Sequence, residues 1–159
     1  MESIKLTIIF LIIVFSSSSE ARSIDSKNFK CLTEAMYYEA RGEPPEGILS
    51  VAHVILNRVK SKRYPNTVCK VVHQQLVEGI WQFSYLGHKE ILNKPINEKA
   101  MKKVKKIAKY AIRMYKADID NIKGSKYYHT TEVNPDWSRS DKLQYIGTFG
   151  FHKFYRRVK

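Results

Sequence analysis

The pattern of apolar and polar positions divides most of the chain into helices and a few short extended segments. Apolar spacing of three and four residues predicts helices over about 25–41, 45–60 and 97–118, and a short helix capped by Thr67. The helix over 45–60 has the widest apolar arc, so we expect it to be the most buried. Alternation predicts extended segments over 79–88 and 127–131 and a β-hairpin over 144–155 that turns around Gly147–Gly150. We therefore expect an α+β domain, mainly helical, with a small antiparallel β-sheet.

The first predicted helix carries a carboxylate on its apolar face. Leu32, Ala35 and Met36 fall on one side of this helix, and Glu39 continues that side one turn later. A carboxylate against an apolar wall costs free energy unless it is paired, neutralised or used. Glu39 is therefore either the partner of Arg41 or of a distant lysine, or a general acid with a raised pKa that faces a groove.

The break after the first helix sets Glu43 apart from Glu39. Gly42 and the two prolines that follow Glu43 end the helix, so Glu43 lies beyond it although its wheel position matches that of Glu39. The simpler role for Glu43 is structural, at the start of the second helix or in a contact with Arg41 or Arg58.

The beginning of the chain has the features of an export signal. Lys5 precedes the apolar run Leu6–Phe15, and a small-x-small site ends at Ala21. The run is shorter than the ~18–20 apolar residues that span a bilayer comfortably. We expect cleavage after Ala21, with an uncleaved membrane anchor as the alternative. The chain then divides into a signal peptide at 1–21, a flexible lead-in at 22–30 and a folded domain at 31–159.

The chain has two cysteines, Cys31 and Cys69. Two cysteines in an exported chain fit one disulfide, which would tie the first helix to the third. A cysteine nucleophile is the weaker alternative, because neither cysteine lies in a recognisable nucleophile motif.

The charge balance is basic, with 28 Lys and Arg against 15 Asp and Glu. Such a surface favours anionic partners such as nucleic acid, anionic lipid or a cell-wall polymer, although a merely solvated surface explains it as well. No stretch alternates basic and aromatic residues as a single-strand-binding groove would, so we expect no nucleic-acid partner. A membrane is expected as a partner only through an uncleaved leader.

Several kinds of site are missing from the sequence. The five histidines form no HExxH motif and accompany no Cys-x-x-Cys pair, so we expect no metal. A Gly-rich phosphate loop and a Gly-x-Ser-x-Gly elbow are also lacking, and we expect no cofactor. Glu39 and Glu43 remain as the main acid candidates, and the aromatic residues suit a groove for sugars, whose apolar faces stack on such rings.

At these residues the chain resembles the SleB-type cell-wall hydrolases, the spore cortex-lytic family. The specific block is Tyr38–Pro44 (YEARGEP), followed by Glu46–Gly47, Val51–Ala52 and Val54–Val59 (VILNRV). Weaker matches follow in the same order at Tyr64–Pro65, Thr67–Val68, Gln82–Ser84, Tyr128–His129, Asn134–Pro135, Trp137, Ile146–Gly147, His152 and Phe154–Tyr155.

This resemblance implies a lysozyme-like fold, similar to that of the soluble lytic transglycosylases. It implies cleavage of peptidoglycan glycan strands between N-acetylmuramic acid and N-acetylglucosamine, by a secreted or periplasmic monomer on the anionic cell wall. The family's catalytic acid falls on Glu39. It would protonate the glycosidic oxygen and then take the proton of the muramoyl C6 hydroxyl, which closes a 1,6-anhydro ring. A hydrolytic muramidase with the same acid and a non-enzymatic cationic wall-binding protein remain as alternatives.

The residues expected to bind the glycan come from the same motifs. They are Glu43, Gln82, Ser84, Tyr128 and His129. For each of these except Glu43, an ordinary structural hydrogen bond is the alternative role. We expect Trp81 and Trp137 to lie in the core rather than to stack on sugars.

Overall fold

The computed structural model describes residues 24–158, so the expected signal peptide and its cleavage site lie outside the described residues. Its helical elements are α1 (Ser26–Ala40), α2 (Pro45–Lys60), α3 (Val68–Val72), η1 (Ser84–Gly87), α4 (Lys89–Leu92), α5 (Glu98–Lys116) and η2 (Asp136–Arg139). Its strands are β1 (Gln75–Val77), β2 (Ile80–Trp81), β3 (Tyr127–Thr130), β4 (Leu143–Phe149) and β5 (His152–Arg157). The predicted α+β class is confirmed. Within this range, every helix is too short or too polar to cross a bilayer.

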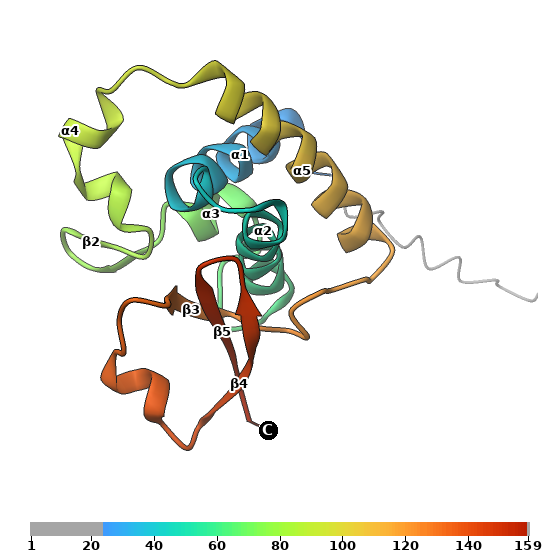
Figure 1. Ribbon diagram of the computed structural model, residues 1–159, viewed down its shortest axis with the longest axis vertical. Helices are drawn as coiled ribbons and strands as arrows, with labels where there is room; N and C mark the ends of the chain where they lie inside the picture. The colour runs from blue at the N-terminus through green and yellow to red at the C-terminus, as the bar shows by residue number, and fades with distance from the viewer. Residues whose placement is uncertain (1–23, 159) are drawn as a thin grey trace, which may run out of the picture.

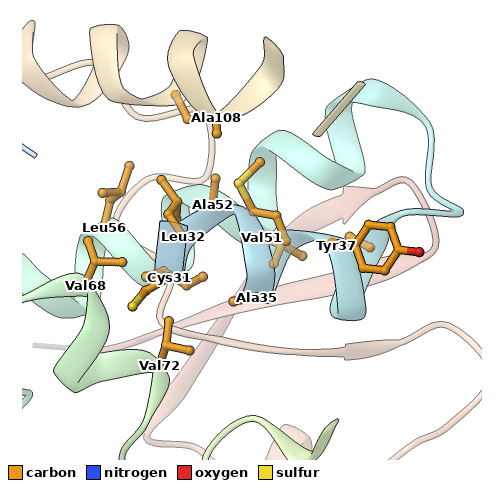
Figure 2. Close-up of a cluster of buried hydrophobic side chains, with 14 of the residues drawn as sticks. Cys31, Leu32, Ala35, Tyr37, Val51, Ala52, Leu56, Val68, Val72 and Ala108 are labelled. Atoms are coloured by element: carbon orange, nitrogen blue, oxygen red, sulfur yellow. The ribbon is translucent and has the colours of Figure 1, made fainter. Parts of the chain in front are cut away.

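The helices pack around α2, which lies between α5 and the three-stranded sheet (Figure 1). Buried side chains of α1, α2, α3 and α5 form the main core, as the labelled residues of Figure 2 show. On the sheet side, Val54 of α2 packs with Ile122 and with Phe154 of β5 in a second cluster. All residues from 51 to 58 are buried, which confirms that α2 is the most enclosed helix.

The first helix begins earlier than a flexible lead-in over 22–30 allows. The Asp25 carboxylate accepts a hydrogen bond from the Asn28 backbone N–H at 2.7 Å and caps the first turn. The Asn28 side chain accepts a hydrogen bond from the Cys69 backbone N–H at 3.0 Å, and Phe29 packs against the core. Residues 26–30 are therefore helical, and the expectation of a flexible lead-in is wrong for them, because a cap and tertiary contacts order this turn.

The main sheet has the strand order β3–β5–β4, with antiparallel pairs throughout. The predicted hairpin is confirmed, but β4 runs through Gly147 to Phe149, and the turn falls at Gly150 and Phe151. The pairing shifts between Tyr145 and Gly147, which marks a β-bulge. The bulge absorbs one residue and lets β4 continue beyond the glycine at which we expected the turn to begin.

The segment over 79–88 does not form the predicted extended structure. Only Ile80–Trp81 is a strand, paired with β1, and the next residues turn into η1. In the part of the chain that the structure describes, no further strand pairs with this segment. The tight turn satisfies its own backbone groups and buries both Phe83 and Tyr85, so the aromatic alternation reflects burial rather than strand geometry.

Glu43 anchors the tip of the β4–β5 hairpin to the start of α2. The residue is 7% exposed. Its Oε2 accepts a hydrogen bond from the Phe151 backbone N–H at 2.6 Å, and its Oε1 lies 3.3 Å from His152 Nδ1. Gly150 approaches α2 so closely that a Cβ there would collide with Glu43 Oε2 and lie 3.0 Å from the Cα of Gly47. Glu43 therefore has a structural contact of the predicted kind, but with the hairpin rather than with an arginine.

The structure contains the expected disulfide between Cys31 of α1 and Cys69 of α3, which are 38 residues apart. Closing a loop of this length removes unfolded-state entropy worth about 4 kcal/mol in the chain-entropy model.

We expect the Cys31→Ala/Cys69→Ala variant to lose about this much free energy of unfolding in urea denaturation. Dithiothreitol should destabilise the wild type and leave the variant unchanged. Equal stability of the wild type with and without the reductant would contradict the prediction.

The hairpin anchor gives a second prediction with a matched control. Gly150 and Gly79 both have positive φ (61° and 77°), but a Cβ at Gly79 meets nothing within 4 Å. Gly79→Ala should therefore cost only the left-handed strain of about 1–2 kcal/mol. Gly150→Ala should cost roughly 1–3 kcal/mol more, because its methyl group displaces the Glu43 carboxylate. Urea denaturation of the two variants measures the difference, and equal losses would show that the close contact carries no energy.

Candidate active site

Glu39 lies near the C-terminal end of α1, on the face that the helix turns to the core. Its Oε2 accepts a hydrogen bond from the Tyr128 hydroxyl of β3 at 2.8 Å. Among the described residues, no lysine or arginine nitrogen lies within 4.0 Å of this carboxylate. The Arg41 guanidinium instead packs over the Tyr37 ring, 4.8 Å from its centre. The pairing of Glu39 with Arg41 that the sequence left open is therefore not present.

The surroundings of Glu39 favour its protonated form. Burial raises the pKa of Glu39 above its ordinary value, and the hydrogen bond from Tyr128 and the charge of Arg58 offset this only in part. Burial and the nearby Glu39 also raise the pKa of Tyr128 well above its ordinary value, so the phenol stays protonated and keeps donating to the carboxyl group. A carboxyl group in such a setting can hold a proton and deliver it to a bound oxygen.

A groove of about 800 Å³ opens over Glu39, between the end of α1, η1, the segment before α5 and β3. Glu39 is the only carboxylate among the described residues that line it. Across the described range, no group of three His, Cys, Asp or Glu side chains is placed to hold a metal ion. Of the residues singled out from the sequence, the groove brings together Glu39, Ser84, Tyr128 and His129.

Ser84 and His129 differ in how far they are open to a ligand. Ser84 is exposed at the start of η1. His129 is buried, with Nδ1 2.8 Å from the Thr130 carbonyl oxygen and Nε2 3.0 Å from the Tyr155 hydroxyl. A carbonyl oxygen can only accept, so the proton lies on Nδ1 and the Tyr155 hydroxyl donates to Nε2. Both nitrogens of His129 are therefore used in structural hydrogen bonds, and Ser84 is the freer polar group.

Two of the expected substrate-binding residues lie outside the groove. Gln82 lines a separate hollow of about 480 Å³, which shares Tyr128 with the groove and which we call the side pocket. Glu43 lines neither cavity, because its carboxylate is bound to the hairpin tip. Its position does not bring it to a ligand in the groove.

The sequence did not single out two aromatic residues of the site, and it predicted the wrong environment for a third. Tyr38 and Tyr85 stack on one wall of the groove with their ring centres 4.6 Å apart. Only the aromatic richness of 79–88 pointed to Tyr85, and Tyr38 entered only as the first residue of the block Tyr38–Pro44, with no role assigned to it. Trp137 is 40% exposed, so its expected place in the core is wrong. Its ring packs against His129 and Tyr155 of the sheet. The other side of the ring stays open to solvent, because no further element covers it among the described residues.

Comparison with known proteins identifies the family of this chain. A family model described as Cell Wall Hydrolase matches residues 42–155, so its match begins just beyond Glu39. The spore cortex-lytic enzyme of Bacillus subtilis (strain 168) is 45% identical over 51 residues, which are 32% of this chain and 17% of that enzyme. The spore cortex-lytic enzyme of Oceanobacillus iheyensis is 47% identical over 47 residues, 30% of this chain and 17% of that enzyme. The matched part of the chain therefore spans only a small part of these relatives.

Two solved structures are similar over most of the fold. The catalytic domain of the Bacillus cereus SleB protein has a TM-score of 0.65 and 27% identity, over 85% of this chain and 94% of that domain. The catalytic domain of the germination-specific lytic transglycosylase SleB from Bacillus anthracis has the same score and identity, over 85% of this chain and 98% of that domain. With the match of the family model over most of the described residues, these likenesses show that the chain belongs to the SleB-type cell wall hydrolase family.

Proposed function

We propose that this chain is a peptidoglycan-degrading enzyme of the cell envelope that acts as a lytic transglycosylase with Glu39 as its catalytic acid. The observation that carries the proposal is a half-buried carboxyl group with a raised pKa that lines a groove, with no second carboxylate among the described lining residues. The family of the chain supports the substrate class, and the printed name of the B. anthracis relative supports the type of reaction.

The geometry fits a two-step proton transfer. In the first step the Glu39 carboxyl group gives its proton to the glycosidic oxygen, so that the bond to the muramoyl C1 breaks and the leaving sugar keeps the bonding electron pair. In the second step the Glu39 carboxylate takes the proton of the muramoyl C6 hydroxyl, and O6 bonds to C1. Tyr128 stabilises the carboxylate between the two steps, because its hydroxyl donates to Oε2.

The absence of a second lining carboxylate favours this route over hydrolysis with a carboxylate partner. Retaining and inverting glycosidases ordinarily use two carboxyl groups, one as acid and one as nucleophile or base. The intramolecular attack of O6 needs neither an enzyme nucleophile nor a positioned water. Ser84, exposed on the groove wall, is the side chain that we assign to hydrogen bonding with the glycan, and the stacked Tyr38 and Tyr85 form an apolar wall for sugar faces.

The charge of the chain fits an anionic wall as the surface on which the enzyme works. The lysines Lys102, Lys103, Lys105, Lys106 and Lys109 of α5 are all exposed. They form a positive face on a core helix, so binding to the wall should weaken as salt increases. The disulfide between Cys31 and Cys69 supports an oxidising location such as the periplasm or the exterior.

Replacing the proposed acid gives the decisive experiment. Glu39→Gln should lower the rate of digestion of purified peptidoglycan by at least about 100-fold, because the proton donor is lost. Mass analysis of the wild-type products should find muramoyl ends that are one water lighter than reducing ends. Reducing ends would indicate a hydrolytic muramidase, and wall binding without turnover by the wild type would indicate a non-enzymatic wall-binding protein.

The exposed Glu46 of α2 provides the matched control, since Glu46→Gln removes the same charge away from the groove and should leave the rate unchanged. Melting temperatures separate lost chemistry from lost folding. A raised pKa means that ionisation of Glu39 opposes folding above that pKa, so Glu39→Gln should melt no lower than the wild type at neutral pH. An active Glu39→Gln enzyme would eliminate Glu39 as the acid.

The hydrogen bond from Tyr128 should set the alkaline limit of activity. The rate requires protonated Glu39, so it should fall as the pH rises through a pKa that lies above the ordinary value of 4.5. Tyr128→Phe removes a hydrogen bond that lowers this pKa, and the alkaline limb of kcat/KM should therefore move to higher pH. Tyr145→Phe, which removes a hydroxyl bonded to Thr148 on the exposed sheet surface, is the control. A limb that moves to lower pH would contradict the assignment.

A further inference from the structure

The side pocket adjoins the groove and has a different electrostatic character. Tyr128 lines both cavities, so a group in the side pocket lies beside a sugar bound over Glu39. The side pocket is lined by three cationic side chains, Arg58, Lys142 and Arg157. None of its described lining residues is acidic. Its charge therefore suits an anionic group that is joined to the sugar in the groove.

Arg58 is the most unusual of these cations, because it is only 4% exposed. Its Nε and Nη2 donate to the Lys126 carbonyl oxygen at 3.0 and 2.8 Å. Among the described residues its Nη1 has no hydrogen-bond partner, and no carboxylate lies within 4.0 Å of the guanidinium. Burial lowers the pKa of Arg58, and its neighbours, among them the charged Glu39, offset this cost only in part. An anion bound in the side pocket would supply the missing compensation.

The rest of the lining offers contacts that suit a peptide. The Gln82 side chain is half-buried and can pair with backbone amides, since it carries both a donor and an acceptor. Trp137, whose side chain is exposed, also lines the side pocket. Lys142 and Arg157 are exposed at the rim, where they can reach further carboxylates.

We propose that the side pocket binds the carboxylate-bearing peptide stem of the muramoyl residue whose glycosidic bond is cleaved at Glu39. This inference rests on the proposed function and names a part of the substrate that the groove alone does not select. The position of the pocket favours a stem over a phosphodiester polymer of the wall. A stem is attached to the sugar in the groove and can therefore reach the adjoining side pocket. A long polymer would need an extended open groove, whereas the side pocket is a small hollow with one buried cation.

The test compares glycan strands with and without stems. The strands are either intact or treated with an amidase that removes the peptide from muramic acid. Wild-type enzyme should have a kcat/KM about tenfold higher on the stem-bearing strands, mainly through a lower KM, as the loss of charge-assisted hydrogen bonds predicts. In Lys142→Gln/Arg157→Gln, which alters exposed rim residues, this preference should fall about tenfold. Arg113→Gln/Lys116→Gln removes the same charges from exposed positions near the end of α5, outside its positive face, and should keep the preference of the wild type.

A binding measurement keeps this inference separate from the proposed reaction. The full chain with Glu39→Gln is titrated with N-acetylmuramoyl-tetrapeptide and followed by calorimetry. Binding that weakens about tenfold in the added presence of Lys142→Gln/Arg157→Gln supports the stem site even if no glycan is cleaved. An unchanged preference in the rim variant, or no binding of the probe, would overturn it. Competition by a glycerol-phosphate polymer with no binding of the muramoyl peptide would assign the pocket to the polymer and also overturn the proposal.

Discussion

Residues 51–58 of α2 are buried on every side, which forces the polar residues among them to find partners within the protein, and the loop before β3 provides these partners. Asp120 Oδ1 lies 3.0 Å from His53 Nδ1, and its Oδ2 accepts from Asn57 Nδ2 at 2.9 Å. Burial alone would raise the pKa of Asp120, but these and two backbone hydrogen bonds hold it well below the ordinary value. The Lys126 carbonyl accepts from Arg58 in the same way. The helix therefore fixes the loop at both ends, and β3 follows directly from it.

This chain of contacts explains how two distant elements meet at one carboxyl group. Helix α1 places Glu39, and β3 places Tyr128, whose position depends on the loop held by α2. The pKa of Glu39 depends on both elements. Burial by the surrounding elements raises this pKa, and the hydrogen bond from Tyr128 of β3 lowers it in part. A change in the loop would thus alter the pKa of Glu39 without touching its side chain, which is how residues far from a site influence its chemistry.

The apolar periodicity of the sequence predicted the elements whose structure depends mainly on residues close together in the chain. The apolar side of α1 located Glu39, and the spacing along α2 and α5 gave their bounds closely, because an amphipathic helix shows its own periodicity. The sequence could not show that Tyr128 donates to Glu39 or that Glu43 holds Phe151, since these pairs join residues about a hundred positions apart. The resemblance to a family, rather than any spacing, linked Glu39 to a reaction. The prediction of an extended segment over 79–88 was wrong because alternation shows only which side chains are buried. A tight turn can bury alternate side chains just as a strand does.

The order of the strands has a consequence for when the site around Glu39 can form. β5 lies between β3 and β4, although it is the last of the three along the chain. Until synthesis has passed Arg157, β3 has no neighbour in the sheet, and Tyr128 cannot be held against Glu39. A chain still being synthesised, or one shortened by proteolysis before β5, would carry Glu39 without the hydrogen bond from Tyr128. The topology thus delays assembly of the proposed active site until β5 has been made.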